Sequence, residues 1–268
     1  MEKRIVLSNQ LAYVSDSALN DGVGGDILIG MSSGNYQYDK IGQLRSDASE
    51  GISLMRWRLG DKKLQRIVRN DASSPEVEFK YNPFGQRVLK IEKPRPGGAI
   101  TQDGSDWIYT YYTYDANGQV MAHYSFVGNI TFGQTVTVDE FNIYGSSREG
   151  QLKTEKVVWQ NGEPNIGFYG IYQNTLGERN YEVTNHLGNV LAVITDRNTV
   201  VDSTYEAVVI MTSDYYPFGM VMPDRNWTSS GAETYRYAYN GMEQDNEVSD
   251  KGNSYTTEFR QYDPRLGR

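Results

Sequence analysis

The stretch YYTYDANGQV, residues 111–120, has the pattern of a tight β-hairpin. Tyr112 and Tyr114 are two residues apart, so they lie on the same face of a strand. Asp115 can accept backbone N–H groups where the turn begins, and Gly118 supplies the positive φ that closes a type I turn with a bulge. The stretch therefore predicts a strand, a turn and a return strand.

Related stretches recur along the chain: YQYDKIGQL at 36–44, FKYNPFGQRV at 79–88, DYYPFGMV at 214–221, RQYDPRLGR at 260–268 and a divergent copy, YEVTNHLGNVLAV, at 181–193. The positions that we expect to build the repeated turns are Tyr38, Asp39, Gly42, Tyr81, Gly85, Tyr112, Tyr114, Asp115, Gly118, Gly188, Gly219, Tyr262, Asp263 and Gly267. The series predicts consecutive β-hairpins whose tyrosine rings pack on the rings of neighbouring hairpins.

Other segments carry hairpin signals of their own. Asn161-Gly162 lies between two alternating stretches and predicts a tight turn. The segment 191–205 predicts two strands around a turn at 196–198, and 140–152 is a further repeat candidate. Helical periodicity over ten residues or more is missing. We therefore predict an all-β fold, in which the hairpins form a curved or spiralling antiparallel sheet.

The composition limits the classes of protein that fit. Of the 268 residues, 38% are hydrophobic and 22% are charged, which is enough apolar material to bury a core. The formal net charge of −8 disfavours binding to nucleic acid or an anionic membrane through a basic surface. Disulfide bonds and thiolate metal sites are excluded because the chain has no cysteine. Neither a signal peptide nor a membrane-spanning helix is expected from its short apolar runs.

The ordered repeats resemble the tyrosine–aspartate (YD) repeat family, also called rearrangement hotspot (RHS) proteins. The resemblance runs from NQLAYVSDSA through the stretches quoted above to YYPFGMVMPDR at 215–225. The stretch YRYAYNGMEQDNEV at 235–248, followed by GNSYTTEFRQYDPRLGR at 252–268, is similar to the end of the RHS-associated core domain.

The resemblance implies an architecture and a role. RHS repeats coil into a β-sheet spiral that closes as a hollow shell, which in bacterial polymorphic toxins and Tc toxin complexes encloses a toxic C-terminal polypeptide. It implies a YD-repeat wall over residues 1–180 and an RHS-associated core region over 181–268 that curls in to plug the shell. A chain of this length is expected to be part of a larger wall, or to work with another chain.

Asp263, in the last repeat, matches one aspartate of the autoprotease found in this family. Many family members self-cleave at an Asp-Pro-x-Gly-Leu motif shortly after this repeat, and an aspartyl dyad needs two neighbouring carboxylates that share a proton. The downstream motif is missing from this sequence. We therefore expect no self-cleavage by this chain, with Asp263 either a turn residue before Pro264 or the remnant of an autoprotease.

No cofactor or metal site is expected. The stretch DGVGGDILIG at 21–30 matches a Ca²⁺-binding nonapeptide only once, whereas such sites take ligands from adjacent turns. A turn or loop is therefore the favoured interpretation. The two histidines, His123 and His186, could form a site only if the fold brings them together.

These features favour a non-enzymatic scaffold that encloses or presents a C-terminal toxin or effector of a longer parent protein or a partner chain. The expected partners are this cargo, other parts of an RHS shell and a component of a secretion system. The expected location is outside the cell or at its surface, reached through the parent protein. We expect an apolar, tyrosine-rich face inside the curve and acidic residues outside.

Two alternatives remain. The first is an adhesion or carbohydrate-binding module at a cell surface, in which Trp107, Trp159 or Trp227 would stack on sugars. The second is an aspartyl autoprotease component that is truncated before its second aspartate.

Overall fold

A computed structural model describes residues 10–14, 31, 33–71, 73–128, 135–165, 175–201, 203–230, 235–249, 251–258 and 260–267. These residues form one antiparallel sheet of 15 strands and a second sheet of three strands, so the predicted all-β fold is confirmed. The calcium-like stretch at 21–30 lies outside the described residues.

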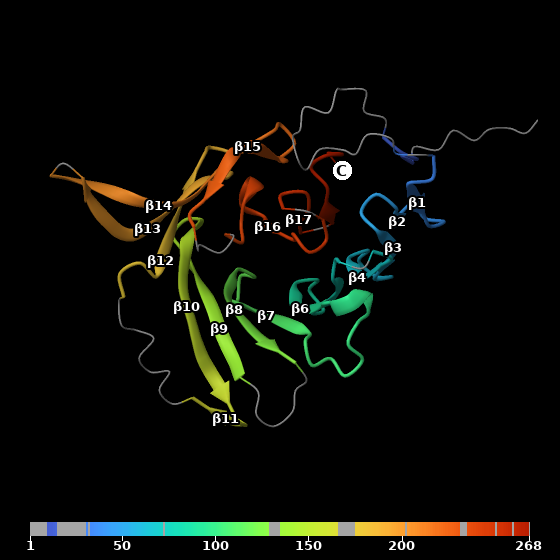
Figure 1. Ribbon diagram of the computed structural model, residues 1–268, viewed down its shortest axis with the longest axis horizontal. Coiled ribbons are helices and arrows are strands. Elements are labelled where there is room, and N and C mark those ends of the chain that lie inside the picture. Colours follow the sequence, from blue (N-terminus) through green and yellow to red (C-terminus); the bar gives the residue numbers. More distant parts are fainter. Residues whose placement is uncertain are drawn as a thin grey trace, which may run out of the picture.

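The large sheet is a meander, in which each strand pairs with its neighbours in the chain (Figure 1). Its strands are β1 (Tyr36–Tyr38), β2 (Leu44–Asp47), β3 (Ile52–Trp57), β4 (Leu64–Arg69), β5 (Glu76–Tyr81), β6 (Arg87–Lys93), β7 (Ile108–Tyr114), β8 (Val120–Val127), β9 (Thr135–Tyr144), β10 (Arg148–Gln160), β12 (Arg179–Thr184), β13 (Val190–Val201), β14 (Thr204–Tyr215) and β15 (Val221–Thr228), with β11 (Glu163–Pro164) on the side of β10. The small sheet contains β16 (Glu243–Gln244), β17 (Tyr255–Thr256) and β18 (Gln261–Tyr262). Two 3-10 turns, η1 (Pro96–Gly98) and η3 (Tyr239–Gly241), complete the elements.

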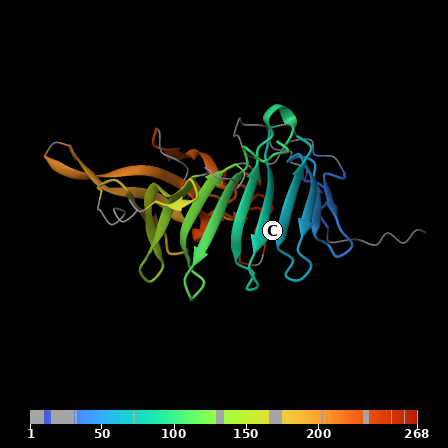
Figure 2. The ribbon, with the colours of Figure 1, turned by 90° about the horizontal axis from the view of Figure 1, so that it is seen from below.

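The repeated turns at Gly42, Gly85, Gly118, Gly188 and Gly219 lie along one rim of the large sheet, because alternate turns of an antiparallel meander return to the same side (Figure 2). Asp115 shows how one turn is built: its Oδ1 accepts the backbone N–H groups of Asn117 and Gln119, at 2.9 and 2.8 Å. Asp39 binds the N–H groups two and four residues later in the same way. The six repeat glycines all have positive φ: Gly42, Gly85, Gly118, Gly188, Gly219 and Gly267.

Four tyrosine hydroxyl groups each link one hairpin to the preceding one. Tyr114 donates to the carbonyl of Arg87, at 2.6 Å, where the return strand of the preceding hairpin begins. The same contact recurs from Tyr81 to Leu64, from Tyr144 to Val120 and from Tyr215 to Val190, at 2.7 to 2.9 Å. These contacts differ from the predicted ring-to-ring packing, because a hydroxyl group binds the backbone of the neighbouring hairpin instead.

Two apolar clusters lie between the large sheet and the residues that follow it. One contains Ile52, Leu64, Ile67, Val77, Phe79 and Val248, and the other contains Val190, Val193, Met211, Tyr235 and Tyr237. Val248, Tyr235 and Tyr237 come from the chain after β15. This last part of the chain therefore packs inside the curve of the sheet, as Figure 1 shows.

The structure confirms one hairpin prediction and corrects another. Asn161 and Gly162 have positive φ and join β10 to β11, as predicted. The predicted turn at 196–198 is wrong, because β13 continues through these residues to Val201. The register with β14 shifts between Ile194 and Asn198, so the extra residues form an irregularity within the strand.

The large sheet also continues without a break in pairing past residue 180. β10 pairs with β12, and β12 to β15 follow in order. The proposed division at 180/181 therefore lies within one sheet, and the boundary between wall and core region stays a prediction.

Candidate functional site

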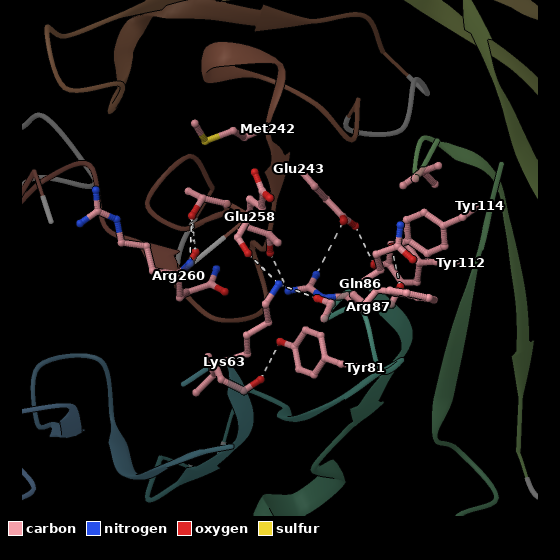
Figure 3. A pocket seen from close by; sticks show the side chains of 18 of the residues that line it. Lys63, Tyr81, Gln86, Arg87, Tyr112, Tyr114, Met242, Glu243, Glu258 and Arg260 are labelled. Atoms are coloured by element: carbon pink, nitrogen blue, oxygen red, sulfur yellow. Dashed lines mark hydrogen bonds and ion pairs between the residues drawn. The ribbon is translucent and has the colours of Figure 1, made fainter. Parts of the chain in front are cut away.

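The C-terminal segment, residues 235–267 without 250 and 259, lies against the concave face of the large sheet (Figure 1). Figure 3 shows the centre of this contact at Arg87, the first residue of β6. Arg87 Nη1 is 2.8 Å from Asp245 Oδ1 and 3.6 Å from Glu243 Oε2. One arginine of the sheet therefore binds two carboxylates of the segment.

A second set of buried groups continues the contact toward β9. Arg236 of the segment donates to Glu140 of β9 and lies 3.2 Å from Glu243. The hydroxyl of Tyr112 donates to Glu243 at 2.7 Å, and His123 Nδ1 lies 3.1 Å from Glu140. In the sheet, His123 lies directly opposite both Tyr112 and Glu140, so these three side chains share one face.

Toward β4, the segment is held by a lysine and an arginine. Lys90 Nζ lies 2.5 Å from Glu247 Oε1. Arg69 Nη2 donates to the backbone carbonyls of Glu247 and Val248, at 2.8 and 2.6 Å. Both cations are almost completely buried, so this part of the interface is shielded from water.

Arg148 of β10 joins the sheet and the segment at the opposite end. Its Nε lies 2.7 Å from Glu182 of β12, and its Nη2 donates to the carbonyl of Gly241. The guanidinium also lies 3.3 Å from the ring centre of Tyr237, within range of a cation–π interaction. The hydroxyl of Tyr235 donates to the same Glu182.

These ion pairs keep the acidic groups of the contact ionised. Burial alone would raise the pKa of Asp245, but the charge of Arg87 and its hydrogen bonds lower that pKa to about 2. Arg87 and Arg236 likewise lower the pKa of Glu243 against the effect of burial. Glu247 differs, because burial raises its pKa to about 6 despite its contact with Lys90.

The expectation of an apolar inner face is wrong for the middle of the sheet. Arg87, Lys90, His123 and Glu140 are all buried there against the segment. Burying such groups is unfavourable unless each finds a partner of opposite charge or a hydrogen bond. The C-terminal segment supplies such partners to Arg87, Lys90 and Glu140, which explains why these charged residues are tolerated on this face.

A cavity of about 650 Å³ lies beside Arg87, between the turn rim and the C-terminal segment (Figure 3). Its walls include Lys63, Tyr81, Tyr114 and Arg260. Lys63 crosses the cavity and donates to the carbonyls of Gly85 and Glu258, at 2.5 and 2.6 Å. The hydroxyls of Tyr81 and Tyr114 serve the repeat-to-repeat links, so these polar groups of the wall have structural partners.

Asp263 lies in an ion pair at the last repeat. Its Oδ2 is 2.7 Å from Arg265 Nη2, and its Oδ1 accepts the backbone N–H of Arg265. Arg265 also contacts Glu50, in the turn between β2 and β3, at 2.5 Å. Arg265 therefore lies between the two carboxylates, whereas in an aspartyl dyad the two carboxylates contact each other and share a proton.

The C-terminal segment contacts turns near both ends of the large sheet. Ser249 donates to Glu50 at 2.9 Å, beside β3, while Tyr255 donates to the carbonyl of Gly219, beside β15. The hydroxyl of Tyr262, in the last repeat, donates to the carbonyl of Phe218. The segment thereby spans the opening of the curved sheet.

Solved structures have a similar fold. The crystal structure of TcdB2-TccC3 matches 81% of this chain with a TM-score of 0.50 and 19% sequence identity, and that of TcdB2-TccC3-Cdc42 matches the same share with a TM-score of 0.51 and 19% identity. The chain has a Tc-toxin-like fold. It spans only 9% of the length of either of those chains.

A third crystal structure, of TcdB2-TccC3 without the hypervariable C-terminal region, matches with the same coverage, a TM-score of 0.50 and 19% identity. The similarity of this Tc-toxin-like chain therefore does not depend on that region. Neither a protein-family model nor a curated protein sequence matches the chain.

Of the other candidate residues, only His123 belongs to this contact. His123 is buried within β8, whereas His186 is exposed in the turn between β12 and β13, so they do not form a shared site. Trp159 and Trp227 are 42% and 51% exposed, while Trp107 donates to the carbonyl of a neighbouring loop residue. Among the described residues, no group of three or more His, Asp or Glu side chains could hold a metal ion.

A search of the described part of the chain also finds no helix that could cross a membrane.

Sequence reasoning missed the acidic residues that anchor the segment. Glu243, Asp245 and Glu247 are spaced by two residues, so an extended backbone turns all three toward one side. This alternation is a signal for a strand with one acidic face. Its partners, Arg87 and Lys90, lie more than 150 residues earlier, and the spacing alone does not identify them.

Proposed function

We propose that this chain is a non-enzymatic wall element of an RHS-type shell, which encloses or presents a polypeptide cargo. The observation that carries the proposal is the contact between the C-terminal segment and the concave face. Buried ion pairs hold this segment inside the curve, where it connects the first strands of the sheet to the last. A polypeptide attached after the segment would start at the inner side of the wall.

The path of the last residues supports this role. Arg265 contacts Glu50 near the beginning of the sheet, and Gly267 lies beside Phe218 near its end. A cargo joined after Arg268 would therefore start where the segment lies between the two ends of the sheet. Such a cargo would be a toxin or effector of a parent protein that is secreted or attached to a cell surface.

The proposal that the chain is non-enzymatic rests on the environment of its carboxylates. Asp263 shares Arg265 with Glu50, and Asp245 shares Arg87 with Glu243. In both sets a guanidinium lies between the carboxylates, whereas an aspartyl dyad needs two carboxylates that contact each other and share a proton. Incubation of the purified chain followed by intact-mass spectrometry should give one unchanged mass; the appearance of two fragments would contradict this part of the proposal.

A fusion experiment tests the role in holding a cargo. An unstructured reporter polypeptide is joined after Arg268, with one protease site close to the junction and one far from it. In the wild-type fusion we expect slower cleavage at the near site than at the far site. In a fusion carrying Asp245→Asn and Glu243→Gln, the segment loses its two carboxylates at Arg87, and the near site should be cleaved as fast as the far site.

The matched control is Asp214→Asn, which removes an exposed carboxylate whose partner is Arg225. This fusion should behave as the wild type. Equal cleavage at both sites in the wild-type fusion would overturn the cargo-holding role. Saturable binding on a glycan array that is lost in Trp159→Ala or Trp227→Ala would instead support the carbohydrate-binding alternative.

A further inference from the structure

Strands β13 and β14 extend beyond the rest of the sheet as a two-stranded arm (Figures 1 and 2). We define the arm as residues 196–201 of β13 and 204–209 of β14, which pair from Asn198–Ala207 to Val201–Thr204. The pairing of β13 with β12 reaches only to Thr195, and β15 pairs with β14 only from Met211 onward. Among the described residues, the outer halves of both strands therefore have no third strand beside them.

The arm exposes apolar side chains. Tyr205 is 78% exposed, Val200 65%, Val201 43% and Val209 37%. A two-stranded ribbon is only marginally stable by itself in water. An exposed apolar patch with open backbone hydrogen-bonding groups is also a template for pairing with another strand. These properties indicate that the arm has a protein partner.

The two edges of the arm are not equally open. On the β13 side, Asp196 accepts the backbone N–H of Gly177, and Arg197 donates to the carbonyl of Leu176 at 2.9 Å. The connection from β10 to β12 therefore occupies the base of this edge. The edge of β14 offers six consecutive residues, 204–209, for a new strand.

We propose that the β14 edge of the arm pairs with the β14 edge of a second copy of this chain, antiparallel and about a two-fold axis at Ala207. In this register Tyr205 lies opposite Val209 of the second copy. Cross-strand pairs of an aromatic and a β-branched residue are favourable, and the small side chain of Ala207 leaves room at the axis. An antiparallel pairing of identical strands satisfies the requirement that a two-fold interface be self-complementary.

The charges of the edge fit the same register. Glu206 is the one charged residue of the sequence TYEAVV at 204–209. In the proposed register it lies opposite Val208 of the second copy, so no like charges are directly opposed. Six residues from each copy form a small interface, which means that the dimer should form in a concentration-dependent manner.

The absence of cysteine from the natural sequence gives a direct test by cross-linking. In the proposed register the two Ala207 Cα atoms lie about 4.5–5.5 Å apart, which suits a disulfide bond. Under oxidising conditions Ala207→Cys should form a covalent dimer. Thr204→Cys, in the same arm, and Lys40→Cys, on the turn rim, should stay monomeric because their copies are far apart.

Light scattering provides the second measurement. Wild-type protein should shift from the mass of one 30.4 kDa chain toward twice that mass as its concentration rises. Val209→Lys places a charge on the open edge and should abolish this shift, with the thermal unfolding of the monomer unchanged. A monomer at every concentration without Ala207→Cys cross-linking would overturn the proposal, as would a dimer that persists in Val209→Lys. Equal cross-linking of Ala207→Cys and Thr204→Cys would also overturn it.

Discussion

Arg87 donates to both carboxylate oxygens of Asp245, at 2.8 and 3.0 Å, although 158 residues separate the two in the sequence. This fork-like geometry matches a planar guanidinium to a planar carboxylate, and both side chains are buried. Asp245 also accepts hydrogen bonds from Thr256 and Gln261 of the small sheet. The pair is therefore one of the points at which the small sheet is fixed to the large one.

Replacing Asp245 by alanine should destabilise the fold strongly. The change leaves the buried charge of Arg87 without its closest partner, and breaking such a pair costs about 3–5 kcal/mol. Urea denaturation monitored by tryptophan fluorescence gives the free energy of unfolding. Asp214→Ala is the matched control, because its ion pair with Arg225 is exposed and should contribute about 0–1 kcal/mol. Equal losses in the two variants would contradict the role given to Asp245.

The same carboxylate should make the stability dependent on pH in the acid range. The pKa of Asp245 falls from 3.8 to about 2 in the folded chain, because Arg87 outweighs the effect of burial. Its contribution is therefore complete above pH 3.8 and is lost as the pH falls through about 2. We expect about 2 kcal/mol of stability to disappear across this range. Thermal unfolding should show that the stability of Asp245→Asn falls less steeply with decreasing pH than that of the wild type. Equal pH dependence in the two proteins would argue against this role of the Asp245 carboxylate.

The tyrosine links between repeats predict a different pattern of losses. Tyr114→Phe removes the hydroxyl that donates to Arg87 and leaves that carbonyl without this bond, so it should cost about 1 kcal/mol. Tyr205→Phe, at a residue that is 78% exposed, should leave the free energy of unfolding unchanged. Chemical denaturation of both variants measures the difference. The link has no energetic role if the two variants unfold at the same denaturant concentration.

Gly219 combines a positive φ of 96° with close packing against Tyr239. A methyl group there would collide with the tyrosine ring, in addition to the backbone strain, so Gly219→Ala should cost about 3 kcal/mol. Gly34 has a φ of 101° but open space around its Cα, and Gly34→Ala should cost only about 1–2 kcal/mol of backbone strain. Melting temperatures of the two variants test the contribution of the C-terminal segment to this turn. If Gly34→Ala lowers the melting temperature as much as Gly219→Ala does, backbone strain alone accounts for the loss of stability and the contact with Tyr239 contributes nothing.

Local features of the fold could be predicted from the sequence, because their causes are local. Asp115 and Gly118 specify a turn within a few residues, and the repetition of this pattern predicts a meander of hairpins. The turn at 196–198 was predicted wrongly, since polar residues suit both a turn and an irregular strand. Pairing with β14 favours the irregular strand over the turn, and residues 196–198 alone do not predict that pairing.

The candidate site was harder to predict, since its charges act between distant segments. Glu243, Asp245 and Glu247 alternate visibly in the sequence, but a solvent-exposed acidic strand would show the same pattern. Arg87 and Lys90 follow a repeat turn, where exposed cations are ordinary. Only the curvature of the sheet brings the two groups together and removes both from water.

The meander has a consequence for the order in which the chain folds. Each strand of the large sheet pairs with strands close to it in the sequence, so hairpins can form one after another as the chain is synthesised. The partners that the C-terminal segment gives to Arg87, Lys90 and Glu140 are synthesised after the whole sheet. Until that segment docks, these side chains face water on the concave side. The large sheet can therefore form before its concave face is covered.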